Sequence, residues 1–176
     1  MIPLLASALF IFGPSCGGKS TLSKALIEQL GPTWVYLERD LLIEDGAANE
    51  EEADDKLEEA IAFLQAHDQD VLIDTQIPWR QPRKRSEKYV LVYAPLPELI
   101  ARDARRTQKL ERTSKRAHYA RLYVEETFSK VFEAPNELHF EYDAIIDSSQ
   151  MQIEEEIKQV LALIDSAPIT EPLNLR

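Results

Sequence analysis

The chain lacks several residue patterns, and each absence excludes a class of protein. Its 176 residues include one cysteine, Cys16, so no internal disulfide is possible and we expect a reducing compartment, the cytoplasm. No apolar run approaches the roughly 20 residues that cross a bilayer, so we expect no membrane partner. The three histidines, His67, His118 and His139, share no metal-ligand spacing, which argues against a zinc site. There is also no internal repeat, no low-complexity linker and no guanine-specifying N/T-K-x-D run.

Positive charge is scarce overall and concentrated where it occurs. The formal net charge is −11, which argues against a general nucleic-acid binder. Residues 80–121 nevertheless carry 13 Lys and Arg against 4 Asp and Glu, whereas the rest of the chain has a net charge of −20. A basic segment of this density in an acidic protein indicates an anionic ligand. With 44% hydrophobic residues, the chain is long enough for one domain that spans residues 1–176.

The most specific signal is the stretch 13–20, which reads Gly-Pro-Ser-Cys-Gly-Gly-Lys-Ser and fits G-x-x-x-x-G-K-[ST]. It follows an apolar run, residues 4–12, and opens a helical pattern, residues 21–30. A strand that feeds a helix through a glycine-rich turn directs backbone N–H groups and the positive end of the helix dipole into one concavity, which suits a polyphosphate. We therefore predict a nucleoside triphosphate site in which Lys19 reaches the β- and γ-phosphates and the Ser20 hydroxyl ligates Mg²⁺. The expected nucleotide-binding residues are Gly13, Ser15, Cys16, Gly17, Gly18, Lys19, Ser20 and Thr21.

Short apolar segments alternate with helical patterns along the chain, which predicts a parallel sheet covered on both faces, a three-layer α/β/α fold. The expected strands are residues 8–12, 34–37, 71–73, 89–93 and 144–146. The expected helices are residues 19–30, 49–67, 97–109, 114–132 and 150–164, with Asn49 as a helix cap and a flexible tail over 166–176. We interpret the apolar N-terminus as the first strand rather than a signal peptide, since cleavage after Ala8 would truncate that strand.

Ligands of such sheets bind beyond the carboxyl ends of the strands, so polar residues there are candidates. Asp74 ends the third strand and is predicted to hold Mg²⁺. Asp40 follows the second strand and is predicted to accept the proton of a hydroxyl acceptor. For both, the alternative is a helix cap. Glu38 and Arg39 are interpreted as an exposed charge pair.

The basic segment is predicted to form a helical lid over residues 102–121. Arginines of such a lid neutralise charge on a transferred phosphoryl group, and we assign this role to Arg102, Arg106 and Arg112. Arginines and lysines further along are expected to pair with nearby glutamates: Lys115, Arg116 and Arg121 with Glu125, Glu126 and the acidic helix.

Four features allow two interpretations each. Trp79 stacks on an acceptor or fills a loop cavity, and the basic run Arg83-Lys84-Arg85 is solvated or contacts an anionic acceptor. The run Asp147-Ser148-Ser149 lies near the adenine end of a nucleotide or caps the last helix. Cys16 makes the loop sensitive to oxidation or is simply a tolerated variable position.

Taken together, these motifs resemble the small P-loop kinases, and among them the chloramphenicol phosphotransferase-like proteins. The resemblance rests on residues 13–20, 34–43, the strand that ends at Asp74, the arginine series and the closing run 140–147. It implies a P-loop kinase fold with a five-stranded sheet and an arginine-bearing lid. It also implies transfer of the γ-phosphoryl group of ATP, with Mg²⁺, to a hydroxyl of a small-molecule acceptor, with Asp40 as the base.

The chain departs from that family in a longer lid between Arg106 and Arg112 and in an acidic loop after Asp40 that has no obvious antibiotic pocket. Three other functions therefore stay open. The first is a nucleoside or nucleotide kinase, in which Arg80 or Arg83 would bind an acceptor phosphate. The second is a polynucleotide 5′-hydroxyl kinase, which would bind oligonucleotides in a salt-sensitive manner through residues 80–121. The third is a nucleotide-binding switch with weak hydrolysis. The sequence leaves the acceptor and the oligomeric state open.

Overall fold

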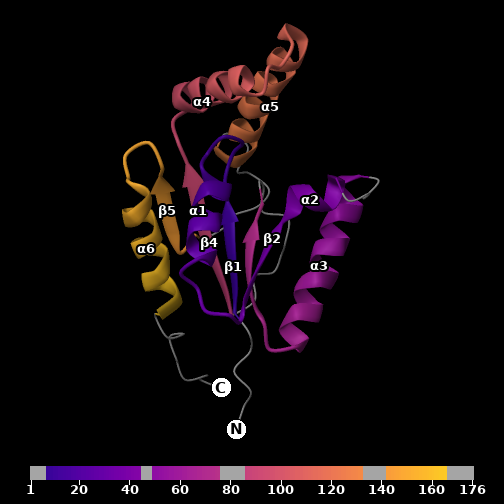
Figure 1. The fold of residues 1–176 in the computed structure, drawn as a ribbon, viewed down its shortest axis with the longest axis vertical. Coiled ribbons are helices and arrows are strands. Elements are labelled where there is room, and N and C mark those ends of the chain that lie inside the picture. Colours follow the sequence, from indigo (N-terminus) through magenta and orange to yellow (C-terminus); the bar gives the residue numbers. More distant parts are fainter. Residues whose placement is uncertain (1–6, 45–48, 76–85, 133–141, 166–176) are drawn as a thin grey trace, which may run out of the picture.

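The computed structural model describes residues 7–44, 49–75, 86–132 and 142–165. Five parallel strands form one sheet in the order β2-β3-β1-β4-β5, with helices on both faces (Figure 1). The strands are β1 Ala8–Phe12, β2 Trp34–Glu38, β3 Asp70–Asp74, β4 Glu87–Tyr93 and β5 Ala144–Asp147. The helices are α1 Lys19–Ile27, α2 Arg39–Glu44, α3 Glu50–Ala66, α4 Leu96–Lys109, α5 Ser114–Phe132 and α6 Ile153–Asp165.

The central strand β1 is buried on both faces of the sheet, which explains why it is wholly apolar, whereas the edge strand β2 is half-buried. On one face, Leu9 and Ile11 of β1 pack with residues of α1 and α6. On the other face, Phe10 and Phe12 pack with Leu57 and other residues of α3. Every residue of β1 is at most 1% exposed. The predicted three-layer α/β/α fold is therefore confirmed.

The strand register brings the predicted site residues to one edge. Ile11 of β1 lies opposite Asp74 of β3, and Glu38 of β2 lies opposite Asp74 on its other side. The turn after Phe12, the end of β3 and the end of β2 therefore emerge side by side. The α4–α5 pair lies above this edge of the sheet (Figure 1).

The element bounds agree with the sequence prediction to within two residues except in three places. Helix α2 follows β2 directly and is absent from the predicted elements. Helix α1 ends at Ile27 rather than at residue 30, because the amides of Gln29 and Leu30 both bond to the Leu26 carbonyl as the helix closes in a turn. Helix α6 begins at Ile153 rather than at residue 150, because the amide of Gln150 bonds to the Asp147 carbonyl in a separate turn.

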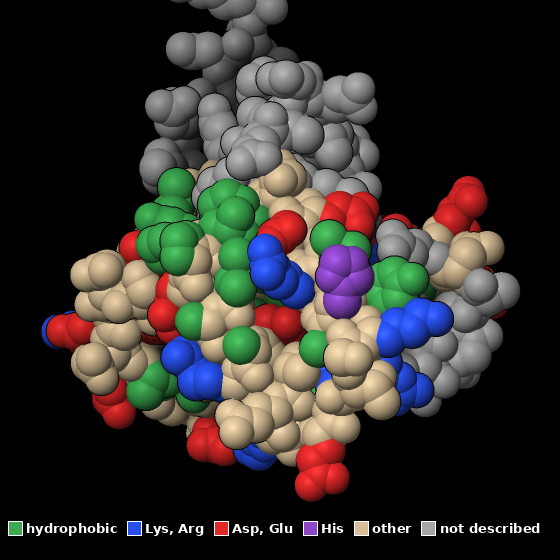
Figure 2. All heavy atoms as spheres, turned by 90° about the horizontal axis from the view of Figure 1, so that it is seen from above, with side chains coloured by type: hydrophobic (Ala, Val, Ile, Leu, Met, Phe, Trp, Pro, Cys, Tyr) green, Lys and Arg blue, Asp and Glu red, His purple; other side chains and the backbone are tan. Residues whose placement is uncertain are grey.

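Other predictions can be compared directly. The Asn49 side chain caps α3 by accepting a hydrogen bond from the Glu52 amide at 2.9 Å, as expected. No helix within the described ranges is long and apolar enough to cross a membrane. On the face shown in Figure 2, Lys and Arg side chains lie among Asp and Glu side chains rather than in one continuous basic area. Several predicted features lie outside the described residues: Trp79, Arg80, Arg83, Lys84, Arg85, His139 and the tail 166–176.

Candidate functional site

The turn between β1 and α1 has a backbone that only glycine permits at its start. A Cβ atom on Gly13 would lie 1.9 Å from the carbonyl oxygen of Val92 on the neighbouring strand β4. At the end of the turn, Gly18 adopts a φ of +104° at the N-cap of α1, where no described side chain bonds to the first amides. The positive end of α1 is therefore open to an anion.

Lys19, Ser20 and Asp74 come together directly beside this turn. The Lys19 ammonium donates a hydrogen bond to the Pro14 carbonyl at 3.1 Å, and the Ser20 hydroxyl donates one to Asp74 Oδ2 at 2.5 Å. Burial lowers the pKa of Lys19, which the Asp74 carboxylate opposes. Burial likewise raises the pKa of Asp74, which is only 4% exposed, against the opposing effects of Lys19 and Ser20.

The Ser20–Asp74 pair has the donor chemistry of a magnesium site. Mg²⁺ prefers oxygen ligands and is commonly bound by one or two carboxylates, with waters and substrate phosphates completing its shell. Within the described ranges no group of three or more His, Cys, Asp and Glu side chains gathers in the manner of an all-protein metal cage. A hydroxyl and one buried carboxylate beside a phosphate-binding turn fit Mg²⁺ in that sparse mode.

Glu38 and Asp40 lie at the adjacent strand end. The Tyr36 hydroxyl is within hydrogen-bond distance of Glu38 Oε2, at 3.3 Å, and of Asp74 Oδ2, at 3.4 Å, so it links the two carboxylates. Burial and these neighbours raise the pKa of Tyr36. Asp40 lies inside the first turn of α2, which begins at Arg39, and not at the cap position before it.

The interpretation of Glu38 and Arg39 as an exposed charge pair is wrong. Arg39 is only 8% exposed, and its Nε donates to Asp54 Oδ1 on α3 at 2.5 Å. This ion pair fixes α2 against α3, so that Glu38 and Asp40 on either side of Arg39 both line the cavity described below. The sequence prediction missed it because residues 39 and 54 are brought together only by the fold.

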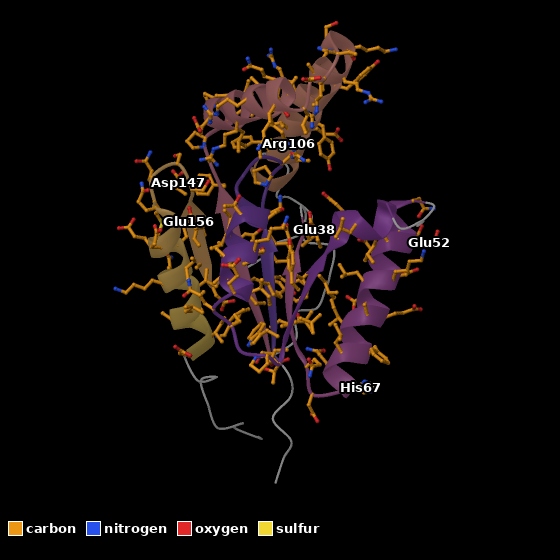
Figure 3. The ribbon with its side chains drawn as sticks, viewed as in Figure 1. Glu38, Glu52, His67, Arg106, Asp147 and Glu156 are labelled. Atoms are coloured by element: carbon orange, nitrogen blue, oxygen red, sulfur yellow. The ribbon has the colours of Figure 1, made fainter. Side chains whose placement is uncertain are left out.

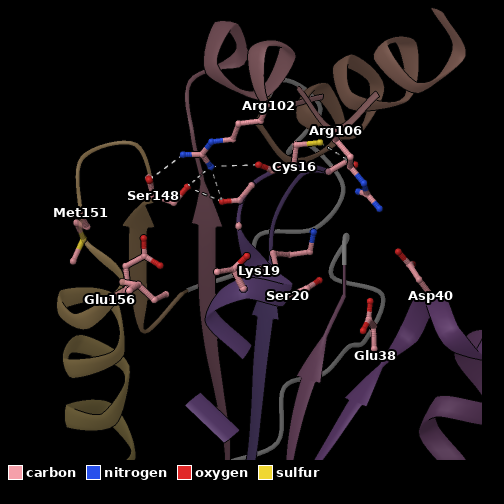
Figure 4. Close-up of a pocket in the computed structure, with 15 residues that line it drawn as sticks. Cys16, Lys19, Ser20, Glu38, Asp40, Arg102, Arg106, Ser148, Met151 and Glu156 are labelled. Atoms are coloured by element: carbon pink, nitrogen blue, oxygen red, sulfur yellow. Dashed lines mark hydrogen bonds between the residues drawn. The ribbon is translucent and has the colours of Figure 1, made fainter. Parts of the chain in front are cut away.

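Arg102 is bonded to the phosphate-binding turn from above (Figure 4). Its Nη1 donates to the hydroxyl of Ser148 at 2.8 Å and lies 3.3 Å and 3.4 Å from the carbonyl oxygens of Cys16 and Gly17. Its Nη2 donates to the Ser148 carbonyl at 3.0 Å, and its Nε to Glu98 at 3.0 Å. Arg102 thus joins three segments that are far apart in the sequence.

The other two predicted lid arginines differ in position. Arg106 is exposed and lines the same cavity, and in Figure 4 its guanidinium lies on the Asp40 side. Arg112 lies outside that cavity, where its Nη1 donates to Asp103 Oδ1 and Thr107 Oγ1, both at 3.2 Å. Further along, Arg121 pairs with Glu125 at 2.9 Å, as predicted.

Helix α5 also contacts the turn. The Ser15 amide donates to Thr127 Oγ1 at 3.1 Å, and Cys16 packs against Ala94, Leu99 and Val124. Cys16 has a φ of 63°, in the left-handed region that non-glycine residues seldom adopt. Its side chain is half-buried beneath the helix pair.

The turn after β5 lies on the side of the phosphate-binding turn away from Asp40 (Figure 4). The Ser148 hydroxyl lies 2.7 Å from the Gly17 carbonyl and 2.9 Å from the Tyr93 carbonyl. The Asp147 carboxylate accepts from the Ser149 amide at 2.9 Å and from its hydroxyl at 2.6 Å, whereas α6 begins only at residue 153. Asp147 therefore shapes this turn, and the helix-cap alternative for it is wrong.

The phosphate-binding turn and the start of α1, the β2–α2 junction, α4 and the segment from the β5 turn to α6 line one cavity of about 510 Å³, which is within the range of small-molecule sites. Figure 3 shows Glu38, Arg106 and Glu156 around the same end of the sheet, whereas Glu52 and His67 lie at the two ends of α3, away from it. The sequence prediction does not include Glu38, Met151, Ile153 or Glu156 among the site residues. The residues that line the cavity are Ser15, Cys16, Gly17, Gly18, Lys19, Ser20, Thr21, Glu38, Asp40, Arg102, Arg106, Ser148, Met151, Ile153 and Glu156.

The layers, the strand order and the phosphate-binding turn define a protein with the P-loop kinase fold. The family model of the AAA domain matches residues 9–126, and the chain belongs to that family. Among curated protein sequences none matches the chain significantly.

Three solved structures illustrate the similarity in fold. Shikimate kinase from Bacteroides thetaiotaomicron is 19% identical, with a TM-score of 0.59 over 90% of this chain and 98% of that one. The tunicamycin resistance protein of Deinococcus radiodurans is 13% identical, with a TM-score of 0.58 over 91% and 96%. A chain of the Pnkp1/Rnl/Hen1 RNA repair complex is 17% identical, with a TM-score of 0.57 over 80% of this chain and 49% of that one. At these identities the likeness shows the fold alone.

Proposed function

We propose that this protein transfers the γ-phosphoryl group of ATP to a hydroxyl group of a small-molecule acceptor. One observation carries the proposal: the phosphate-binding turn and the Asp40 carboxylate open into the same cavity. A polyphosphate on the N-terminus of α1 would have its end beside Lys19, and an acceptor between that end and Asp40 would be positioned for transfer.

Each group of residues in and beside the cavity has a distinct role in the proposed transfer. The turn amides and Lys19 bind the phosphates, while Ser20 and Asp74 are the residues that would hold Mg²⁺. When bound, that ion neutralises charge on the phosphates. Asp40 accepts the proton of the acceptor hydroxyl, and Glu38, which accepts a hydrogen bond from the Tyr36 hydroxyl, lines the neighbouring wall. Arg106, exposed on the Asp40 side, neutralises charge on the group in transfer. For Arg102 and Arg112, direct contact with the phosphates stays a prediction, because here they bond to other groups.

The size of the cavity and the nature of two structural neighbours support a small acceptor. Shikimate kinase and a tunicamycin resistance protein share the fold. We extend the proposal to chloramphenicol-like acceptors only as one class to be tested, on the basis of the sequence resemblance described above.

A polynucleotide 5′-hydroxyl kinase is the second candidate, and one observation favours it. Helices α4 and α5 carry exposed basic side chains, Arg105, Lys109, Lys115 and Arg116, on the helix pair whose Arg102 and Arg106 line the cavity. A chain of an RNA repair complex is among the structural neighbours. This candidate requires oligonucleotide binding that weakens steeply as salt is raised, which binding titrations at several salt concentrations would detect.

A phosphotransfer screen tests the proposal. The purified protein is incubated with Mg²⁺ and γ-labelled ATP against sugars, shikimate-like acids, nucleosides, nucleotides, aminoglycosides, amphenicols and 5′-hydroxyl oligonucleotides. Label should move to one small-molecule class. Lys19→Ala should abolish ATP binding and turnover, whereas Lys24→Ala, an exposed lysine further along α1, should change neither. ATP hydrolysis without transfer to any acceptor would instead favour a nucleotide-dependent switch.

A further inference from the structure

Glu156 is a buried carboxylate that faces the cavity. It lies in the first turn of α6, is only 5% exposed and lines the cavity wall, and in Figure 4 its side chain points toward the space below Ser148. Its oxygens are not among the fully buried atoms of the described residues, so the carboxylate opens on the cavity although most of the residue is covered. Within the part of the chain that the structure describes, the Glu156 carboxylate has no hydrogen-bond partner.

The positive charge that acts on Glu156 is that of Arg102, which bonds to other groups. Burial raises the pKa of Glu156, and the positive charge of Arg102 opposes that larger effect by lowering it. However, the guanidinium nitrogens of Arg102 donate to Glu98, to Ser148 and to the carbonyls of the phosphate-binding turn. Arg102 therefore favours the ionised form of Glu156 without taking up its hydrogen-bonding capacity, which is left for a ligand.

Glu156 is at the α6 end of the cavity. Glu38 and Asp40 lie on one side of Lys19 and Ser20, and Met151 and Glu156 lie on the other (Figure 4). If the phosphates bind at Lys19 and the acceptor at Asp40, the nucleoside extends toward α6. Met151 and Ile153 line that end, and such apolar side chains suit the faces of a flat base.

We propose that Glu156 selects the nucleobase of the bound triphosphate by accepting an N–H hydrogen bond from the amino-bearing edge of an aminopurine. An ionised carboxylate only accepts hydrogen bonds, so it pairs with the 6-amino group of adenine or with the N1–H and 2-amino group of guanine. A purine without an amino group offers this carboxylate fewer donors on that edge, or none. The inference rests on the proposed function only in that the turn binds a nucleoside triphosphate.

The test measures binding, not turnover. Isothermal titration with Mg²⁺ compares ATP with purine riboside triphosphate, which lacks the 6-amino group, and GTP with inosine triphosphate, which lacks the 2-amino group. In at least one pair the wild-type protein should bind the amino-bearing nucleotide about 10-fold or more tightly, the effect of one hydrogen bond to a charged group. Glu156→Ala should abolish this preference and the isosteric Glu156→Gln should reduce it. Glu154→Gln, the same change at an exposed position of α6, should leave it intact.

Each other outcome overturns the inference. Equal binding within both pairs by the wild-type protein would show that the amino group is not read. A preference that survives in Glu156→Ala would assign the reading to another residue. If the Glu156 variants lost affinity for ATP but not for 2′-deoxy-ATP, Glu156 would contact the ribose 2′-hydroxyl and not the base. Failure of the wild-type protein to bind any triphosphate would refute the proposed function itself, which separates the two failures.

Discussion

Arg102→Ala should destabilise the protein far more than the same change at Arg105, although both arginines bond to Glu98 on one helix. Arg102 makes two short bonds to Ser148, at 2.8 Å and 3.0 Å, and two longer contacts with the turn carbonyls. At about 1.5 kcal/mol for each short bond from a charged donor, the loss is about 3 kcal/mol in the free energy of unfolding. For a chain of this length that corresponds to roughly 6–12 °C in Tm.

Urea denaturation and calorimetry of the ligand-free protein would measure this loss. Arg105→Ala is the matched control, because that guanidinium is 64% exposed and should leave the unfolding midpoint nearly unchanged. Arg102→Lys should recover only part of the loss, since an ammonium group cannot reproduce the planar fork that reaches both oxygens of Ser148. Equal midpoints for Arg102→Ala and Arg105→Ala would refute the view that Arg102 joins α4, the phosphate-binding turn and the β5 turn.

Two further predictions concern the carboxylates. Asp40→Asn should abolish phosphoryl transfer to the acceptor and leave ATP binding and Tm unchanged. The control Asp55→Asn, at an exposed position on α3, should leave transfer, ATP binding and Tm unchanged. A fall in the Tm of Asp40→Asn with transfer retained would assign Asp40 a structural role. Burial raises the folded-state pKa of Asp74 above 3.8, so the folded chain holds this proton more tightly than the unfolded chain, and the stability contributed by Asp74 falls as the pH rises from about 4. At neutral pH, Asp74→Asn should therefore unfold at a higher urea concentration than the wild-type protein, and Mg²⁺ should increase its affinity for ATP less. Urea midpoints measured across pH would contradict the stability prediction if the wild-type protein were more stable at every pH.

The parts of the site that follow from local sequence are predictable. Residues 13–20 specify their own turn, and strand ends in a parallel sheet meet at one edge, so the sequence alone suffices to group Lys19, Ser20 and Asp74. The 2.5 Å bond between Ser20 and Asp74 confirms that grouping. The fold class follows from the same alternation of apolar strands and helices.

The parts that depend on packing between distant segments are not predictable in this way. Ser15 and Thr127, separated by 112 positions, meet only because α5 folds back over the turn. Nothing in the sequence distinguishes Arg106, which faces the cavity, from Arg112, which Asp103 and Thr107 hold outside it. In the sequence Glu156 is one of several acidic residues on an amphipathic helix, and its burial depends on how α6 packs against the rest of the fold.

The hydrogen bond between the Ser15 amide and the Thr127 hydroxyl would have to break before a phosphate could bind this amide of the turn. The Ser15 amide that a phosphate oxygen would recruit is already satisfied by the Thr127 hydroxyl, so an incoming anion displaces a partner instead of filling a void. Thr127 would keep its other hydrogen bond, in which its hydroxyl donates to the Val124 carbonyl at 3.1 Å. A phosphate oxygen that took the Ser15 amide would therefore remove the hydrogen bond by which Thr127 of α5 holds this amide of the turn.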